Sequence, residues 1–298
     1  MKISSLFAPL HNRIAKWVRR VLLGVGLVSI IQILPWSPTL WWARRNDNRI
    51  ISREPLANRG ADRISEADLR NLPDPIRRYI ETVGWIGRPR PSFMRITTQA
   101  SRMLVAGFPS PVAMRFTQLN AAASPERQRV ARGRTAGLAL EAVDAFVNGT
   151  DTLQVVSARL VPLLRRAGRD MDASGLAAWI AEAILIPGAL LERGDHNHTI
   201  IWTPIDDKSA GITVKAFGLT VDGVFTINGD GLVHSFTTDG RPWVHGRRHY
   251  RPAGWTMTYD SWVDTAGGKL PTMLKTFWHV DGKDTQGLIS KNATITFW

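Results

Sequence analysis

The sequence predicts an α+β fold: a large curved antiparallel β-sheet, half-barrel-like, with one amphipathic helix packed on one face. From Phe93 to the C-terminus, apolar and polar residues mostly alternate with the period of two that a half-buried β-strand requires. One helical pattern, residues 172–186, interrupts this alternation. Near the N-terminus, residues 21–34 form an uncharged apolar run. We therefore expect an N-terminal transmembrane helix and short helices before the sheet.

Short turn sequences divide the alternating region into strands. Asn148-Gly149, Asp239-Gly240 and Asp281-Gly282 are dipeptides that favour tight turns between strands. Short loops imply that successive strands are antiparallel neighbours in the sheet. The expected strands are residues 93–104, 112–119, 129–137, 139–147, 152–158, 199–204, 211–216, 220–228, 232–238, 244–250, 255–264, 273–280 and 288–297.

Two short helical segments are expected before the first strand. Ser65 and Asp68 have the spacing of a capping box, which satisfies backbone N–H groups at the start of a helix. Asp74 followed by Pro75 predicts a second helix, with Asp as its cap and Pro at its first position. Gly84 is the expected end of that helix.

The apolar run, residues 21–34, has the surroundings of a membrane helix. Arg19 and Arg20 directly precede it, and Trp residues flank it on both sides, as at membrane interfaces. Because about 20 apolar residues span a bilayer comfortably, the expected membrane contact extends over residues 17–42. A cleaved signal peptide and a peripheral or buried helix are the alternatives, although no convincing small-x-small cleavage site follows the run.

The chain divides into a membrane anchor, residues 1–43, a polar linker, residues 44–63, and a single β-rich domain, residues 64–298. Five Lys or Arg residues precede the apolar run and five lie in residues 35–59 that follow it, which is a tie under the positive-inside rule. The two arginines that adjoin the run favour an N-terminus inside the cell. The expected location is therefore a bacterial inner membrane, with a single pass and the domain on the extracytoplasmic side.

The net charge of +13 first suggests a nucleic-acid partner, but the distribution of charge argues against one. Residues 1–90 hold 16 of the 38 Lys and Arg residues and 7 of the 25 Asp and Glu residues. Most of the excess thus surrounds the apolar run, where anionic lipid head groups are the better partner, and we expect no nucleic-acid binding. The absence of cysteine excludes disulfides, thiolate catalysis and Cys-ligated zinc. No cofactor is expected.

Four short motifs in a fixed order resemble those of one family. Residues 72–80 (LPDPIRRYI) resemble the L-P-x-P-[VI]-R-R-Y-[LI] opening of an uncharacterised bacterial family of unknown function. Residues 172–191 resemble that family's helix with an internal Glu that runs into a proline. Trp202 with Ile205-Asp206 resembles its W-x-x-I-D strand, and residues 267–271 are similar to its G-x-x-[IL]-P turn.

The resemblance covers about residues 66–298, which is most of the chain outside the expected anchor. It implies the fold and no reaction, because no activity is established for that family. Residues 121–137 depart from the pattern, since they are rich in Ala and Arg where family members tend to be more aromatic.

Glu182 is the candidate catalytic residue, because it lies inside an otherwise apolar helical segment, residues 177–186. A buried carboxylate must find a partner or change its pKa. In one interpretation Glu182 is a general base or a polar anchor for a ligand. In the other, which we favour, it forms an ion pair with a strand arginine such as Arg132, Arg247 or Arg248.

The remaining candidates lie in the last third of the chain. Residues 245–251 alternate so that one face of an expected strand is basic and suited to an anionic group, with a solvated outer face as the alternative. His196 and His198 have H-x-H spacing, but two ligands are not a site and we expect no metal. Trp residues of this region either line an apolar pocket or pack in the core. The expected ligand-binding residues are Trp202, Arg247, His249, Trp262 and Trp278, and Trp243 and Trp255 are further candidates for the pocket.

Three functions are compatible with the sequence. The first is a membrane-tethered, non-enzymatic module that binds an apolar or amphipathic small molecule, or a lipid, in the concavity of the sheet. The second is a hydrolase-like enzyme that uses Glu182. The third is a structural partner in an envelope complex that docks through the basic strand at Arg247 and Arg248. The sequence leaves the oligomeric state open.

Overall fold

The computed structural model describes residues 16–24, 26, 30, 37–53, 62–105, 108, 110–191, 198–245 and 249–298. The helices are α2 (Pro38–Arg53), the 3-10 helix η1 (Glu66–Leu69), α3 (Asp74–Thr82) and α4 (Arg169–Ala183). The strands are β1 (Phe93–Met103), β2 (Val112–Ala121), β3 (Arg127–Thr135), β4 (Leu138–Val147), β5 (Thr150–Ser157), β6 (Val161–Ala167), β7 (His198–Pro204), β8 (Ser209–Ala216), β9 (Leu219–Ile227), β10 (Val233–Thr238), β11 (Trp243–His245), β12 (His249–Arg251), β13 (Gly254–Thr265), β14 (Gly268–Val280), β15 (Lys283–Lys291) and β16 (Thr294–Phe297).

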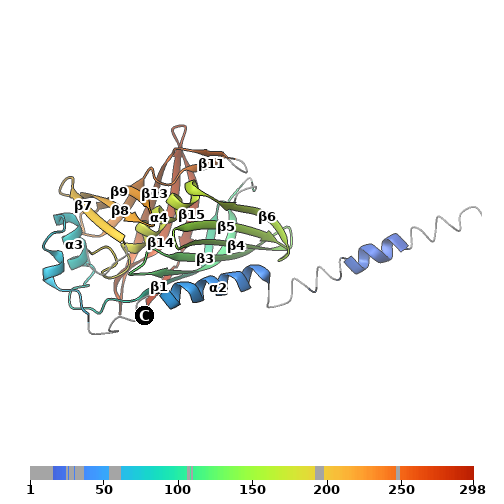
Figure 1. The fold of residues 1–298 in the computed structure, drawn as a ribbon, viewed down its shortest axis with the longest axis horizontal. Helices are drawn as coiled ribbons and strands as arrows, with labels where there is room; N and C mark the ends of the chain where they lie inside the picture. The colour runs from blue at the N-terminus through green and yellow to red at the C-terminus, as the bar shows by residue number, and fades with distance from the viewer. Residues whose placement is uncertain are drawn as a thin grey trace, which may run out of the picture.

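Fourteen strands form one curved antiparallel sheet, as the sequence predicts (Figure 1). The strand order is β6-β5-β4-β3-β2-β1-β15-β14-β13-β10-β9-β8-β7, and β16 also pairs with β1. The sheet has two arms, β1–β6 and β7–β10 with β13–β15, which are joined where β1 pairs with β15. Neighbours in the chain are neighbours in the sheet almost throughout, because short turns connect them.

Helix α4 connects the two edge strands, β6 and β7, and lies against the inner face of the sheet (Figure 1). It contacts β4, β5 and β6 of one arm and β9 of the other. Nearly every residue from Leu176 to Ala183 is buried, so α4 has no solvent-exposed face there. Gly175 permits this approach, since a Cβ atom at that position would lie 2.6 Å from Cδ2 of Phe146.

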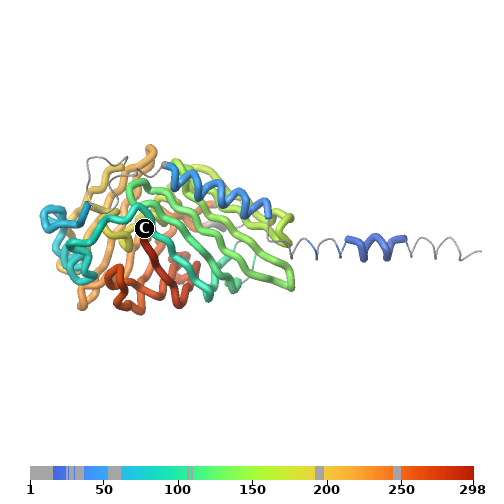
Figure 2. Tube along the Cα trace, turned by 90° about the horizontal axis from the view of Figure 1, so that it is seen from below, coloured from blue at the N-terminus to red at the C-terminus, as the bar shows by residue number. Residues whose placement is uncertain are grey.

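Helix α2 covers the outer face of the first arm, along β3 and β4 (Figure 2). Leu40, Ala43 and Ile50 recur at helical spacing and are buried against the sheet. Gln128 of β3 donates its Nε2–H to the Ala43 carbonyl oxygen at 2.8 Å and to Asp47 Oδ1 at 2.5 Å. The expectation of a linker over all of residues 44–63 was therefore wrong for its first half, which belongs to helix α2. The many charged residues of this segment concealed the helical spacing of its buried side chains.

Several local predictions are confirmed by the backbone. Asn148 and Gly149 have φ values of 54° and 74°, as the tight turn between β4 and β5 requires. Asp281 and Gly282 adopt similar values, 52° and 72°. Ser65 forms the expected capping box, in which Asp68 Oδ2 accepts the Ser65 backbone N–H at 2.7 Å.

Other elements differ from their expected bounds. Asp74 lies inside α3 and Pro73 is its N-cap, so the expected Asp cap was wrong. Strand β6 has no counterpart among the expected strands, because its residues, VPLLRRA, do not alternate. The expected strand at residues 244–250 is instead two short strands, β11 and β12, that pair with each other. A single strand with one continuous basic face therefore does not form there.

The apolar run of residues 21–34 lies mostly outside the described residues. Residues 16–24 are helical. No helix in the described part of the chain is both long enough and apolar enough to cross a membrane. The transmembrane helix, the inner-membrane location and the boundary of the anchor stay predictions.

Candidate functional site

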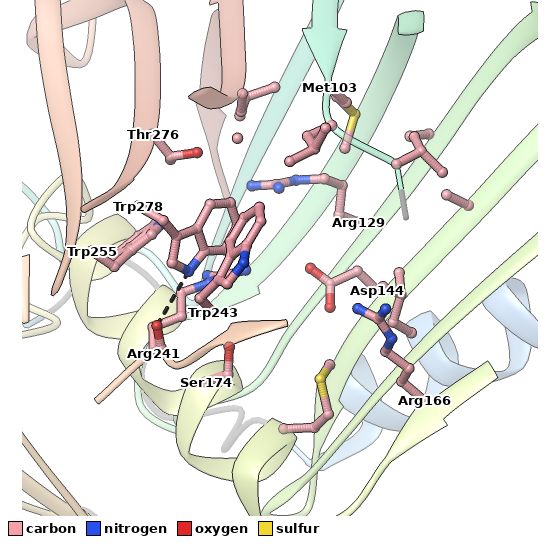
Figure 3. Close-up of a pocket in the computed structure, with 18 of the residues that line it drawn as sticks. Met103, Arg129, Asp144, Arg166, Ser174, Arg241, Trp243, Trp255, Thr276 and Trp278 are labelled. Carbon is pink, nitrogen blue, oxygen red and sulfur yellow. Dashed lines mark hydrogen bonds between the residues drawn. The ribbon is translucent and has the colours of Figure 1, made fainter. Parts of the chain in front are cut away.

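A cavity of about 660 Å³ lies between α4 and the inner faces of both arms of the sheet. Two of its walls have different chemistry (Figure 3). The charged wall consists of Arg129 on β3, Asp144 on β4, Arg166 on β6 and Glu182 on α4. The aromatic wall consists of Trp243 on β11, Trp255 on β13 and Trp278 on β14. The remaining lining is mainly aliphatic and includes Met103, Leu153, Leu163, Leu164, Met171, Met257 and Leu288.

Glu182 is the centre of the charged wall and accepts four hydrogen bonds. Its Oε2 accepts from Gln118 Nε2 at 2.5 Å, from Asn120 Nδ2 at 2.8 Å and from Arg127 Nε at 3.0 Å. Its Oε1 accepts from Arg129 Nη2 at 2.9 Å. Two guanidinium groups and two amides thus offset the desolvation of this buried carboxylate.

Arg127 links Glu182 to Asp144 on the same wall. Its Nη1 lies 3.0 Å from Asp144 Oδ2. Burial disfavours the charge of Asp144, but the charges of Arg127, Arg241 and Arg129 and the hydrogen bond from Arg127 together outweigh it and lower the pKa of this carboxyl to about 2. Burial raises the pKa of the neighbouring Asp151 well above its ordinary value, and the negative charge of Asp144 raises it further. The pKa values of these two neighbouring carboxyl groups are therefore shifted in opposite directions.

The aromatic wall holds a fourth arginine near the cavity. The Arg241 guanidinium carbon lies 4.7 Å from the ring centroid of Trp255 and 5.6 Å from that of Trp278, within the range of cation–π attraction. Trp278 Nε1 donates to the Arg241 carbonyl oxygen at 3.2 Å (Figure 3). Gly287 makes room for this wall, because a Cβ atom there would lie 2.3 Å from Trp278 Cζ3.

The structure places some of the sequence-predicted site residues at the cavity and others away from it. Trp278 and Glu182 line the cavity. Trp202 packs instead on Phe225, with its Nε1 donating to the Leu190 carbonyl oxygen at 3.0 Å. Trp262 lies edge-on to Tyr79, 6.1 Å between ring centroids.

Two predicted residues cannot be placed in this way. Arg247 lies outside the described residues, and so does the side chain of His249, whose backbone belongs to β12. The ligand-binding roles of all five predicted residues stay predictions. His196 also lies outside the described residues, and no cluster of three metal-ligating side chains occurs in the part of the chain that the structure describes.

Sequence reasoning missed the arginines that pair with Glu182. The favoured interpretation, an ion pair with a strand arginine, is what the structure shows, but the partners are Arg127 and Arg129 rather than Arg132. A signal existed: Arg127, Arg129 and Ala131 alternate along β3 and therefore share one face. These residues belong to the Ala- and Arg-rich stretch that departs from the family pattern.

The geometry argues against a general base at Glu182. Both of its oxygens accept hydrogen bonds from arginines, one from Arg127, which is buried, and one from Arg129, whose side chain is 12% exposed. A base must reach the proton of a substrate or water, and here its acceptor positions are occupied. The hydrolase-like alternative therefore loses the residue on which it depended.

Comparison with known proteins gives the family. A family described as "Family of unknown function (DUF6544)" matches residues 62–288. The chain belongs to this family. The resemblance drawn from the sequence motifs, to a bacterial family of unknown function, is thereby confirmed at the level of the family. No curated protein matches the DUF6544 chain significantly.

One solved structure is similar in part to this DUF6544 protein. It is the crystal structure of a LolA superfamily protein from Nitrosomonas europaea, with a TM-score of 0.33 and 12% sequence identity. The match covers 74% of this chain and 91% of that chain. We draw no functional conclusion from a likeness of this size.

Proposed function

We propose that this DUF6544 domain binds an apolar or amphipathic small molecule, or a lipid, in the cavity between α4 and the sheet. The observation that supports the proposal is the cavity itself, about 660 Å³ with aromatic and aliphatic lining and a few convergent polar groups. Small-molecule sites of roughly 300–1,000 Å³ have this composition. Three tryptophans supply a large apolar surface, and a few charged side chains supply polar groups.

The proposal places the cavity next to a membrane surface. The sequence supports this position through the apolar run of residues 21–34 and the arginines that adjoin it. Helix α2, which follows the run, exposes Trp41 and Arg45, whose guanidinium carbon lies 5.7 Å from the Trp41 ring centroid. Exposed Trp and Arg side chains suit an anionic lipid interface.

Mass spectrometry of the full-length chain under native conditions tests the proposal, together with an organic extract of the purified protein. We expect a bound amphiphile at near-stoichiometric yield. Ala142→Phe places an aromatic ring at the cavity lining, and we expect it to remove the bound mass. Ala113→Phe adds the same ring at an exposed position of β2 and should leave the bound mass unchanged. A melting curve shows that each variant is folded.

The opposite result is equally clear. A wild-type protein that carries no small molecule and takes up none on incubation with fatty acids, phospholipids or long-chain alcohols would contradict the proposed function. Equal retention of a ligand by the Ala142→Phe and Ala113→Phe variants would place the ligand outside the cavity.

The membrane position has a test of its own. The full-length chain should sediment with membranes and resist extraction by high salt, because apolar contact is insensitive to ionic screening. Removal of residues 1–36 should release the domain into the soluble fraction. Membrane association that survives this deletion would assign the contact to α2 or the domain instead.

A further inference from the structure

Arg241 differs from the other two arginines of the buried network. Arg127 and Arg129 donate to Glu182, and Arg127 also pairs with Asp144. Arg241 approaches Trp255 and Trp278, and its buried Nε has no hydrogen-bond partner among the described residues. Its guanidinium thus lines the cavity with hydrogen-bond donors still available.

The charged side chains that line the cavity do not balance without a further anion. Among the described residues that line it, three are arginines, Arg129, Arg166 and Arg241, and two carry carboxyl groups, Asp144 and Glu182. Three cations therefore face two anions. A buried charge that lacks a partner is costly, so the site favours a ligand that supplies the missing negative charge.

The position of Arg241 indicates where that charge lies. The two Trp rings hold the planar guanidinium, and a guanidinium binds a carboxylate or a phosphate through two parallel hydrogen bonds. Leu153, Leu163 and Leu164 line another part of the same cavity and offer an apolar surface. A free inorganic anion would leave this surface unused.

We propose that Arg241 binds the anionic group, a carboxylate or phosphate, of an amphiphile whose apolar chain occupies the rest of the cavity. The inference rests on the proposed function and adds the sign of the ligand's charge and the residue that recognises it. It also assigns different parts to the arginines: Arg127 and Arg129 hold Glu182, whereas Arg241 contacts the ligand.

Four probes with the same twelve-carbon chain test this proposal on the full-length chain, by quenching of Trp fluorescence at pH 7. Dodecanoate and dodecyl phosphate are anionic, dodecanol is neutral and dodecyltrimethylammonium is cationic. We expect the anionic probes to bind about tenfold or more tightly than dodecanol, as expected for a charge-assisted hydrogen bond. The cationic probe should bind more weakly than dodecanol. Inorganic phosphate without a chain should bind at least a hundredfold more weakly than dodecyl phosphate.

Variants at Arg241 locate the recognition. Arg241→Gln should abolish the advantage of the anionic probes and leave dodecanol binding within about twofold of the wild type. Arg241→Lys keeps the charge but not the planar fork, and should restore part of the advantage. Arg134→Gln, at an exposed position of β3, is the matched control and should change no affinity.

The outcomes separate this inference from the proposed function. If dodecanol binds as tightly as the anionic probes, the cavity takes neutral apolar ligands: the proposed function stands and the role of Arg241 is overturned. If inorganic phosphate binds as tightly as dodecyl phosphate, the site is for a free anion, which overturns the amphiphile. If no probe binds, both proposals fail. An anionic advantage that survives Arg241→Gln in a folded protein overturns the assignment to Arg241.

Discussion

The wall of the cavity built by β3, β4, β6 and α4 presents charged side chains, whereas the wall built by β11, β13 and β14 presents tryptophans. Both walls consist mainly of antiparallel strands of the same sheet. On the charged wall, Glu182 is enclosed by donors, and each of its oxygens has a partner within the protein. On the aromatic wall, Arg241 approaches two rings, and its buried Nε has no hydrogen-bond partner within the described part of the chain.

Buried charge therefore has two uses in this molecule: it joins elements of the fold, and it faces the cavity. The four hydrogen bonds to Glu182 join α4 to β2 and β3 and hold the helix against the sheet. Arg241 forms no ion pair with the residues that the structure describes, and its side chain lines the cavity. We therefore expect substitutions on the charged wall to affect stability first and substitutions on the aromatic wall to affect binding first.

The strongest test of the comparison is Glu182→Gln. It leaves Arg127 and Arg129 buried without their carboxylate, and we expect a loss of about 3–5 kcal/mol in the free energy of unfolding. Denaturant unfolding measures this loss. Glu81→Gln, at an exposed position, is the control and should change stability by less than about 0.5 kcal/mol. A small effect at Glu182 would mean that the network does not hold α4 in place.

Trp278→Ala and Trp202→Ala make a matched pair on the aromatic side. Both tryptophans are half-buried, and each donates its Nε1–H to a backbone carbonyl. Each substitution should destabilise the protein by about 2–3 kcal/mol. Of these two tryptophans, only Trp278 lines the cavity. Trp278→Ala should therefore weaken binding of dodecyl phosphate by about tenfold, and Trp202→Ala should not. Equal binding losses would show that the binding surface extends beyond the cavity.

Gly175→Ala sharpens the comparison by displacing α4 without changing any charge. A Cβ atom at this position would lie 2.6 Å from Phe146 Cδ2 and 2.8 Å from Asp151 Cβ, so the helix must shift. We expect about 2 kcal/mol of destabilisation from this overpacking, measured by denaturant unfolding. Gly218→Ala is the comparison: no atom lies within 4 Å of its added Cβ, so any loss of stability there comes from the positive φ of that turn and not from crowding. An unchanged stability for Gly175→Ala would contradict close packing of α4 on β4 and β5.

The smallest expected effect lies at Asp47, on the outer face. Burial raises the pKa of this carboxyl to about 6, although the hydrogen bond from Gln128 and the charge of Arg95 oppose the increase. The folded state thus favours the protonated form of Asp47. The stability that this preference contributes is fully present below about pH 4 and is lost as the pH rises through 6.

Asp47→Asn keeps the acceptor for Gln128 and removes the titration. We expect it to raise the free energy of unfolding at pH 7 by about 1 kcal/mol, after allowing for the water that reaches this partly exposed carboxyl. Melting curves at pH 4 and pH 7 measure the change, which should vanish at pH 4. Probe affinity should stay constant, because Asp47 lies outside the cavity lining. A gain at pH 4 as large as that at pH 7 would refute the titration of Asp47 as its cause.

Local chemistry explains what could be predicted of the fold. Asn-Gly and Asp-Gly turns fix where strands reverse, and alternation fixes which residues share a face. The predictions failed where the local sequence pattern of a helix or strand was weak. Helix α2 was not predicted because charged residues dominate its sequence, although Leu40 and Ile50 belong to its buried face. Strand β6 was not predicted because its residues do not alternate.

The candidate site was predicted in part. Glu182 was recognised because one carboxylate inside an apolar helix must have a partner, and Trp278 was recognised as a large apolar side chain of the C-terminal strands. Trp202 and Trp262 have the same sequence properties as Trp278, yet they pack away from the cavity. Composition cannot separate such residues, because the same burial stabilises a core and a ligand site.

By itself, the sequence determined the antiparallel strands, the tight turns, the family and the need of Glu182 for a cation. Only the tertiary structure decided which arginines meet that need, because Arg127 lies 55 residues from Glu182 along the chain and reaches it through the placement of α4 inside the sheet. The cavity was decided in the same way. Pairing of β1 with β15 brings the two arms together, and the position of α4 between them leaves space that no local pattern specifies.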